Sequence, residues 1–278
     1  QSDKILSWGD LHIHTTFSDG SHSVHEVLDM SAEQGLSTVA ITDHDSVQGV
    51  EEALVAGETL GIKVIRGVEI SVEEEKDEIH VLGFFSHALS ETFRKEMERI
   101  RKTRFIRAEK ILQDLSEHGI DLDMKNILKR AGSDYVGRPH IADEMVSAGI
   151  CGDRNEVFRE YLVFGKPGYA KRSNGVTLEK AFHMIKAEKG LVFVAHPALY
   201  PEPEILLERV IELGFDGIEV FHPSHNDGFS ERLLKICRDN SLLVSGGSDF
   251  HHTGDSGNYR PGCVKLDNKY IKEIEGAF

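Results

Sequence analysis

The chain has 278 residues and a formal net charge of −15, which together exclude several classes of protein. An acidic surface disfavours stable binding to duplex DNA, because such binding depends on Lys and Arg contacts to phosphates. No apolar run approaches the roughly 20 residues of a membrane span, and the first residues lack a signal-peptide pattern. The scattered cysteines Cys151, Cys237 and Cys263 predict a cytoplasmic protein without a disulfide framework.

Short apolar runs alternate with amphipathic segments along most of the chain. Strands are predicted at 8–14, 37–42, 63–70, 79–85, 191–195, 217–221 and 242–246. Helices are predicted near 23–35, 46–60, 177–189, 203–213 and 228–240. This alternation favours a parallel α/β architecture. Polar residues at the strand ends favour a closed barrel over an open sheet, because parallel barrels build their sites there.

The middle of the chain breaks this alternation. From about 88 to 172 the pattern is helical, with helices predicted near 90–118, 122–131, 139–148 and 154–160. We therefore predict that residues 1–98 and 172–278 form the barrel. Residues 99–171 are predicted to form a helical insertion that contributes to the substrate site.

Histidine is the anomaly of the composition, with 15 residues. His12 and His14 flank one residue in a predicted strand, so both imidazoles can point to the same side. Asp249 and His251 have the same spacing after the last predicted strand. The other candidate ligands at or near strand ends are Asp19, His44, Glu69, His80 and His196.

Each of these residues has a simpler interpretation by itself, such as a turn for Asp19 or a structural histidine for His80. Glu69 is different, because a carboxylate within an apolar strand is costly to bury without a partner. One metal cluster explains all the candidates together. Mixed His and carboxylate ligands suit Zn, Mn or Fe better than calcium. The sequence therefore predicts two or three divalent ions.

These segments resemble the polymerase-and-histidinol-phosphatase (PHP) superfamily of metal-dependent phosphoesterases. The matching segments are DLHIHTTFSDG, ITDHDSVQG, GVEIS, EIHVLGF, AHP and GSDFHH, in family order over nearly the whole chain. The resemblance implies a distorted seven-stranded (β/α) barrel with three metal sites. The implied ligands are His12, His14, Glu69 and Asp249 for the first site, Glu69, His80 and His196 for the second, and Asp19, His44 and His251 for the third.

The segment GRPHIA at 137–142 resembles a motif in a narrower group of PHP proteins. This group includes nucleoside 3′,5′-bisphosphate phosphatases and a 5′-to-3′ exoribonuclease. The resemblance implies that Arg138 and His140 face the substrate, and an Arg fork matches phosphate geometry. Arg172, where the insertion rejoins the barrel, is a further substrate-binding candidate. The basic run Arg101, Lys102, Arg104 and Arg107 is interpreted as a solvated helix face.

The predicted reaction is hydrolysis of phosphate esters on nucleotides or short oligonucleotide 5′ ends by a hydroxide that bridges two ions. Asp249 and His222 are the catalytic candidates, with His222 as proton donor or phosphate contact. The substrate would be a small phosphorylated molecule, and the sequence indicates no oligomeric state.

Three rivals stay open. A histidinol-phosphate-type phosphatase is disfavoured by the insertion and the GRPHIA segment. An amidohydrolase acting on a C–N bond is disfavoured because no Lys occupies a convincing strand end. The complete set of ligand types disfavours a third possibility, a non-enzymatic metal-sensing domain.

Overall fold

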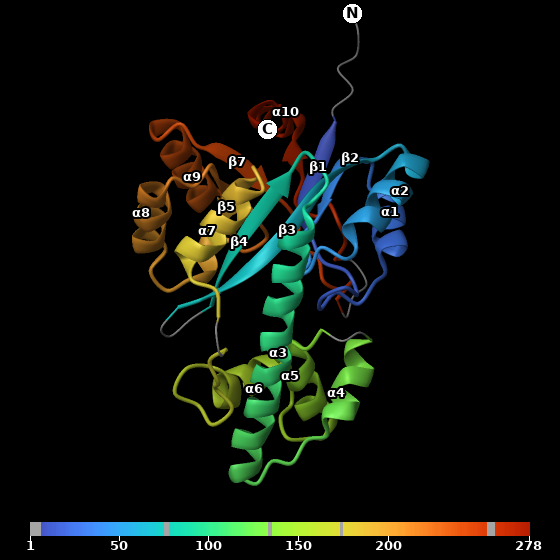
Figure 1. The fold of residues 1–278 in the computed structure, drawn as a ribbon, viewed down its shortest axis with the longest axis vertical. Coiled ribbons are helices and arrows are strands. Elements are labelled where there is room, and N and C mark those ends of the chain that lie inside the picture. The colour runs from blue at the N-terminus through green and yellow to red at the C-terminus, as the bar shows by residue number, and fades with distance from the viewer. Residues whose placement is uncertain (1–6, 75–77, 133–134, 173–174, 255–258) are drawn as a thin grey trace, which may run out of the picture.

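The computed structural model describes residues 7–74, 78–132, 135–172, 175–254 and 259–278. One sheet runs through the barrel domain in the strand order β7-β6-β5-β4-β3-β2-β1-β8 (Figure 1). The strands are β1 (Trp8–Ile13), β2 (Leu36–Ile41), β3 (Lys63–Glu73), β4 (Glu78–Phe85), β5 (Leu191–Val194), β6 (Gly217–Phe221), β7 (Leu243–Gly246) and β8 (Leu266–Asp267). The seven predicted strands are therefore confirmed, and β8 is an addition.

The two ends of the sheet meet at β1, which curls the sheet into a nearly closed barrel. β8 pairs antiparallel with the first residues of β1, at Trp8 and Gly9. The segment after β7 bridges the other end of β1, where Ile13 pairs with Phe250 and the backbone N of His14 lies 2.8 Å from the Phe250 carbonyl oxygen. The predicted barrel is confirmed, with eight strands in the sheet instead of seven. β8 has only two residues, too few for a hydrophobic pattern to reveal it.

The direction of β4 corrects the expectation of a parallel sheet. β1 to β3 pair in parallel, as do β5 to β7, but β4 is antiparallel to both β3 and β5. β3 ends at Glu73 and β4 begins at Glu78, which leaves no room for the crossover that parallel neighbours need. The beginning of β4 therefore lies beside the end of β3. This reversal brings His80, near the start of β4, to the edge of the sheet where its neighbours end.

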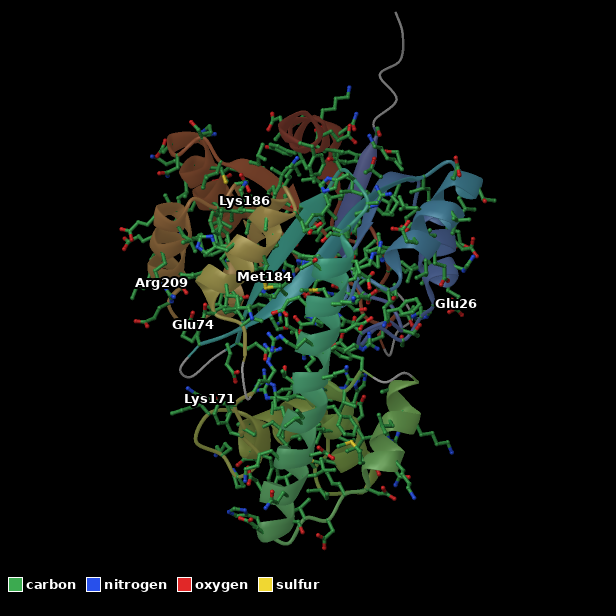
Figure 2. The ribbon with its side chains drawn as sticks, viewed as in Figure 1. Glu26, Glu74, Lys171, Met184, Lys186 and Arg209 are labelled. Atoms are coloured by element: carbon green, nitrogen blue, oxygen red, sulfur yellow. The ribbon has the colours of Figure 1, made fainter. Side chains whose placement is uncertain are left out.

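Helices cover the barrel on its outside (Figure 1). They are α1 (Val24–Glu33), α2 (Val50–Leu60), α7 (Leu178–Ala187), α8 (Pro203–Leu213), α9 (Asp227–Asp239) and α10 (Asn268–Ala277). Local sequence sets several of their ends. Ser23 and Glu26 form a capping box at the start of α1, and Gly61 in the left-handed region ends α2. Five of the six were predicted, and α10 was not. Arg209 of α8 also forms an ion pair, 3.1 Å long, with Glu74, the residue that follows β3 (Figure 2).

A second body lies below the barrel in Figure 1. It consists of the lower part of α3 (Glu91–Glu117), with α4 (Met124–Ala131), α5 (Arg138–Ser147), α6 (Arg154–Val157) and the π-helical turn η1 (Phe158–Leu162). These helices lie near the four helices predicted between 90 and 160, and they share a separate apolar core that includes Ile111, Ile141 and Met145. The assignment of residues 99–171 as an insertion that contributes to the substrate site stays a prediction. The upper part of α3 packs into the barrel core through Phe93 and Met97. The predicted boundary at 98/99 therefore falls within one continuous helix that joins the two cores.

None of the helices in these described ranges could span a bilayer.

Candidate metal centre and substrate cavity

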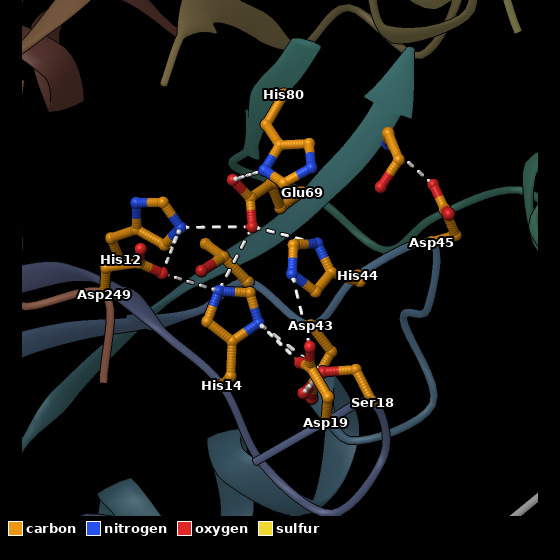
Figure 3. Close-up of polar contacts among 12 residues, drawn as sticks. His12, His14, Ser18, Asp19, Asp43, His44, Asp45, Glu69, His80 and Asp249 are labelled. Atoms are coloured by element: carbon orange, nitrogen blue, oxygen red, sulfur yellow. Dashed lines mark hydrogen bonds and ion pairs between the residues drawn. The ribbon is translucent and has the colours of Figure 1, made fainter. Parts of the chain in front are cut away.

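The carboxylate of Glu69 is fully buried on β3 and lies at the centre of the predicted ligands (Figure 3). Imidazole nitrogens of five histidines surround its two oxygens. At Oε2 they are those of His12 (3.2 Å), His14 (3.1 Å) and His44 (3.0 Å), and at Oε1 those of His80 (3.1 Å) and His196 (3.0 Å). Residues from β1 to β5 therefore converge on one carboxylate.

Asp249 brings a second carboxylate to this group from the loop after β7. Its Oδ1 lies 3.2 Å from Nε2 of His12 and 3.1 Å from Nε2 of His14. Its backbone is in the left-handed region, with φ of 51°, and that of His196 has φ of 29°. Such conformations are strained for residues other than glycine and persist where the surrounding structure holds them.

Asp19 forms the third acidic position, in the loop after β1. Its Oδ1 lies 3.3 Å from Nε2 of His251 and 3.9 Å from Nδ1 of His14. Its Oδ2 lies 3.7 Å from Nε2 of His44. The structure thus brings all nine predicted ligands into one continuous group.

Three subsets of this group have ligand atoms that all lie within 4.8 Å of one another. They are His12-His14-Glu69-Asp249, His44-Glu69-His80 and His14-Asp19-His44-His251. The first is the same as the first implied site. The second subset contains His44 in place of His196, and the third contains His14 in addition to the three implied residues. His196 still lies 3.0 Å from Glu69. The metal-binding role of each residue stays a prediction.

Unpaired buried atoms test whether a cation suits these residues. Polar atoms that are buried without a hydrogen bond are costly, by about 1–3 kcal/mol each. In the described structure, several such atoms point into the group: Nε2 of His12 and His14, Nδ1 of His44, Oε2 of Glu69, and Oδ1 of Asp19 and Asp249. Some of these nitrogens and oxygens lie 3.0–3.2 Å apart, but their orientations do not allow a hydrogen bond between them. Imidazole and carboxylate donors of this kind fit a divalent transition metal ion.

The electrostatics of the group also favour cations. Burial raises the pKa of Glu69, Asp19 and Asp249, but the neighbouring histidines outweigh it and hold the pKa of each carboxyl group well below its usual value. These three carboxylates are therefore ionised at neutral pH. As ionised groups they can serve as anionic ligands, and a bound divalent ion would replace the histidine protons as the positive charge that balances them.

Glu219 was missed by the sequence analysis and contacts two of the predicted ligands. It is fully buried on β6. Its Oε1 lies 2.7 Å from Nδ1 of His12, and its Oε2 accepts a 2.7 Å hydrogen bond from the backbone N of His196. Glu219 is a carboxylate within the apolar run GIEVF, which is the same pattern that identified Glu69 as a candidate. The sequence therefore contained a signal for Glu219.

His222 lies just after β6 at the margin of the group. Its Nε2 is 3.2 Å from Oδ2 of Asp249, and its Nδ1 is 2.7 Å from Oγ of Ser224. The side chain is buried. This position beside a central carboxylate is compatible with its predicted role, which stays a prediction.

A cavity of about 330 Å³ opens beside the group, between the barrel and the helical insertion. Its polar lining includes Asp19, His44, Glu78, His80, Arg104, Tyr135, Arg138 and His196. Arg138 begins α5, and its Nη2 lies 3.9 Å from Oε1 of Glu78. The predicted substrate residue Arg138 therefore lies in the same cavity as four of the predicted metal ligands.

The basic run on α3 corrects another expectation. Arg101, Arg104 and Arg107 are buried, so for these three the prediction of a solvated face is wrong. Arg104 Nε donates a 2.6 Å hydrogen bond to Asp45 Oδ2, and its guanidinium lies over the ring of Tyr135. Periodicity along α3 could not show that carboxylates of the barrel face this side of the helix. The structure thus adds Arg104 to the candidate substrate residues.

His140 and Arg172 lie outside the cavity wall. Nδ1 of His140 accepts a 3.2 Å hydrogen bond from the backbone N of Gly137, which stabilises the start of α5. Arg172 donates hydrogen bonds to Asp45, at 3.2 Å, and to the carbonyl oxygen of Ser71. Both side chains are buried. Their positions suggest support of the cavity wall, and the predicted substrate contact remains a prediction.

A barrel that gathers histidines and carboxylates at one end of its sheet has the architecture of a metal-dependent hydrolase. The model of the PHP domain family matches residues 10–163, and the chain belongs to this family.

Two curated relatives cover most of the chain. It is 32% identical over 253 residues to the 3′,5′-nucleoside bisphosphate phosphatase of Chromobacterium violaceum, covering 89% of this chain and 88% of the relative. It is 31% identical over 251 residues to the 5′-3′ exoribonuclease Rnm of Escherichia coli, covering 87% of this chain and 84% of the relative. The protein is a phosphoesterase, a hydrolase that acts on phosphoric ester bonds.

Solved structures agree with this fold over nearly the whole chain. A protein from Bifidobacterium adolescentis, assigned as a metal-dependent phosphoesterase, superimposes with a TM-score of 0.83 at 30% identity. A protein from Chromobacterium violaceum named as an amidohydrolase, with bound sulfate and no metal, superimposes with a TM-score of 0.86 at 30% identity. Both alignments cover 97% of this chain and 96% of the other chain.

Proposed function

We propose that the protein hydrolyses phosphate esters on nucleotides, either nucleoside 3′,5′-bisphosphates or the 5′ ends of short oligonucleotides. In this proposal Glu69 and the eight other predicted ligands hold two or three divalent ions, with Zn, Mn and Fe as candidates. The observation that carries it is the cavity in which Arg104 and Arg138 face the His and carboxylate group. The names of the two curated relatives support a nucleotide substrate.

The side chains of the cavity have separate tasks in this proposal. Bound divalent ions would supply an activated water and neutralise charge on the phosphate oxygens. Arg138 and Arg104 would hold a phosphate group through guanidinium hydrogen bonds. His222, beside Asp249, would donate a proton to the leaving oxygen. No Ser or Cys nucleophile is needed.

The acidic surface is compatible with an anionic substrate of small size. The net charge of −15 repels an extended polyanion such as duplex DNA. Within the cavity, bound cations would reverse the local potential, and the two arginines would add positive charge. A mononucleotide or a short single strand can therefore bind where a duplex is repelled.

The experiment that tests the proposal is metal analysis of the purified protein, paired with a panel of esters. The panel contains a nucleoside 3′,5′-bisphosphate, a short 5′-phosphorylated RNA, histidinol phosphate and an amide substrate. We expect bound divalent metal and the highest kcat/KM on one of the nucleotides. Preference for histidinol phosphate, or turnover of the amide alone, would contradict the proposal. Metal binding without turnover of any ester would favour the metal-sensing alternative.

Removal of metal is expected to abolish this activity reversibly. Treatment with a chelator should reduce turnover at least about 100-fold, because the activated water and the charge neutralisation are both lost. Separate addition of Mn, Fe or Zn should restore turnover. The ion that restores the highest turnover would be identified as the one that best suits the site. Circular dichroism provides the control, since the fold should persist. Full turnover in the chelated protein would show that no metal is required.

Substitution of Arg138 by alanine should weaken substrate binding. The guanidinium lines the cavity and its neighbour Glu78 lies 3.9 Å away, so the side chain has donors left for a phosphate. We expect the apparent KM for the best nucleotide to rise about 10-fold, with kcat changed less. Steady-state kinetics measure both values. Arg159→Ala, at an exposed position on η1, is the control, and unchanged kinetics for Arg138→Ala would remove Arg138 from the site.

A further inference from the structure

Exposed apolar side chains gather at the mouth of the substrate cavity. Among the described residues, eight large hydrophobic side chains are exposed. Three of them, Val163, Phe164 and Leu199, line this one cavity. Val163 and Phe164 follow η1 in the helical insertion, whereas Leu199 belongs to the 3₁₀ turn η2 (Pro197–Leu199) of the barrel. Both bodies of the molecule therefore contribute apolar surface to the same opening.

Contacts with neighbouring residues position the Phe164 ring and the backbone of Leu199. Phe164 is 51% exposed, yet its ring packs edge-to-face against Tyr169 with centroids 5.4 Å apart. Leu199 is 55% exposed, and its backbone N donates a 3.0 Å hydrogen bond to the carbonyl oxygen of His196. Isolated apolar residues on a surface need no explanation, but a cluster at a polar cavity marks a binding site.

The lining of the cavity combines two kinds of side chain. One part carries charge and hydrogen-bonding groups, from the predicted ligands and from Arg104 and Arg138. The other part is apolar and aromatic, formed by Phe158, Val163, Phe164, Leu199 and Pro201. A ligand that fills both parts has an anionic group at one end and a planar, weakly polar ring at the other.

The two parts are close together along the chain as well as in space. His196 contacts Glu69 at 3.0 Å, and Leu199 ends the 3₁₀ turn that follows it. By the rise of a 3₁₀ helix, three residues span about 6 Å. The sugar of a nucleotide bridges a similarly short distance between a phosphate and its base.

We propose that Phe164 and Leu199 form a nucleobase subsite, so that the enzyme selects phosphate esters that carry a planar base. This inference rests on the proposed function and deepens it, because it names the part of the substrate that sets specificity. The base stacks on the Phe164 ring, and Leu199 contacts it from the barrel. Contact with a π-face tolerates every base, so the subsite distinguishes nucleotides from other phosphate esters without preferring one sequence.

The test compares an ester that has a base with one that lacks it. Adenosine 3′,5′-bisphosphate and ribose 5-phosphate are assayed with the metal-loaded wild-type protein and with Phe164→Ala and Leu199→Ala. Where ribose 5-phosphate turns over slowly, its inhibition constant is measured instead. We expect kcat/KM for the nucleotide to fall about 10-fold in Phe164→Ala, mainly through KM, as stacking losses of this kind suggest. Leu199→Ala should show a smaller loss, and values for ribose 5-phosphate should stay within about twofold.

Two further variants keep the outcome decisive. Phe164→Trp retains a planar surface and should keep kcat/KM for the nucleotide within about threefold. Ile106→Ala, an exposed apolar residue on α3 away from this cavity, should change neither substrate. Equal losses on both substrates in Phe164→Ala, or no loss on the nucleotide, would overturn the subsite while leaving nucleotide hydrolysis intact. A wild-type protein that hydrolyses no nucleotide would overturn the proposed function and the subsite together.

Discussion

Glu69→Gln is expected to lower metal content and to reduce phosphoesterase turnover at least about 100-fold. A change at a residue that only orients a metal ligand already costs about 10- to 100-fold, and Glu69 is itself a predicted ligand. Glu69 meets five histidines, His12, His14, His44, His80 and His196, through its two oxygens. Glutamine has nearly the same shape but replaces one anionic oxygen with an amide NH₂. The amide NH₂ carries no negative charge and cannot coordinate a metal ion. The two predicted metal sites that share Glu69 therefore lose a ligand.

Metal analysis and steady-state kinetics measure the two effects, and circular dichroism tests whether the barrel persists. Glu58→Gln, an exposed glutamate on α2, is the matched control and should behave as wild type. Asp249→Asn should resemble Glu69→Gln, because Asp249 Oδ1 lies 3.1–3.2 Å from both His12 and His14. Wild-type metal content and turnover in Glu69→Gln would show that this carboxylate is not a ligand.

The second large effect is expected at Glu219, which the sequence analysis missed. Glu219→Gln should weaken metal affinity about 10- to 100-fold, as is typical when a residue that orients a metal ligand is changed. A carboxylate oxygen accepts, so Oε1 takes the Nδ1–H of His12, and this would leave Nε2 of that ring, beside Glu69 and Asp249, as the atom available to a cation. Oε2 accepts from the backbone N of His196. Glutamine has one acceptor oxygen in place of two, so one of these contacts is lost.

A metal titration distinguishes this orienting role from a general loss of stability. If Glu219 orients His12, affinity falls, while excess metal restores most of the turnover. Glu212→Gln, an exposed glutamate on α8, is the control and should leave affinity unchanged. Equal metal affinity in Glu219→Gln and wild type would refute the orienting role, even if the melting temperature falls.

The fold could be predicted where local pattern and tertiary structure agree. The seven predicted strands and most helices followed from the alternation of apolar runs and amphipathic segments. In the structure, local caps at Ser23 and Gly61 agree with this pattern. The position of β4 in the chain was predicted correctly, but its antiparallel direction was not. Direction depends on the length of the β3–β4 connection and on hydrogen bonds to β5, and a strand's own side-chain alternation is the same in either direction. β8 was too short to leave a pattern.

The candidate site divides in the same way. Histidine and carboxylate types at strand ends are visible in the sequence, since few other roles explain Glu69 in an apolar strand. Arg104 was misinterpreted because helix periodicity identifies a face of α3 but not what covers it. The partners of that face, Asp45 and Tyr135, come from distant parts of the chain.

By itself, the sequence determined which residue types occupy the strand ends, and this pattern predicted a barrel with a cluster of candidate metal ligands at one end. Burial of apolar strands and the cost of unpaired buried carboxylates act on composition and spacing, which are written in the chain. Only the tertiary structure decided which predicted ligands belong to more than one subset and that Glu219 contacts His12 and His196. It also decided that exposed apolar side chains line the same cavity as the charged ones. Those features depend on contacts between residues more than a hundred positions apart, such as His12 and Glu219, and no local pattern encodes such a pairing.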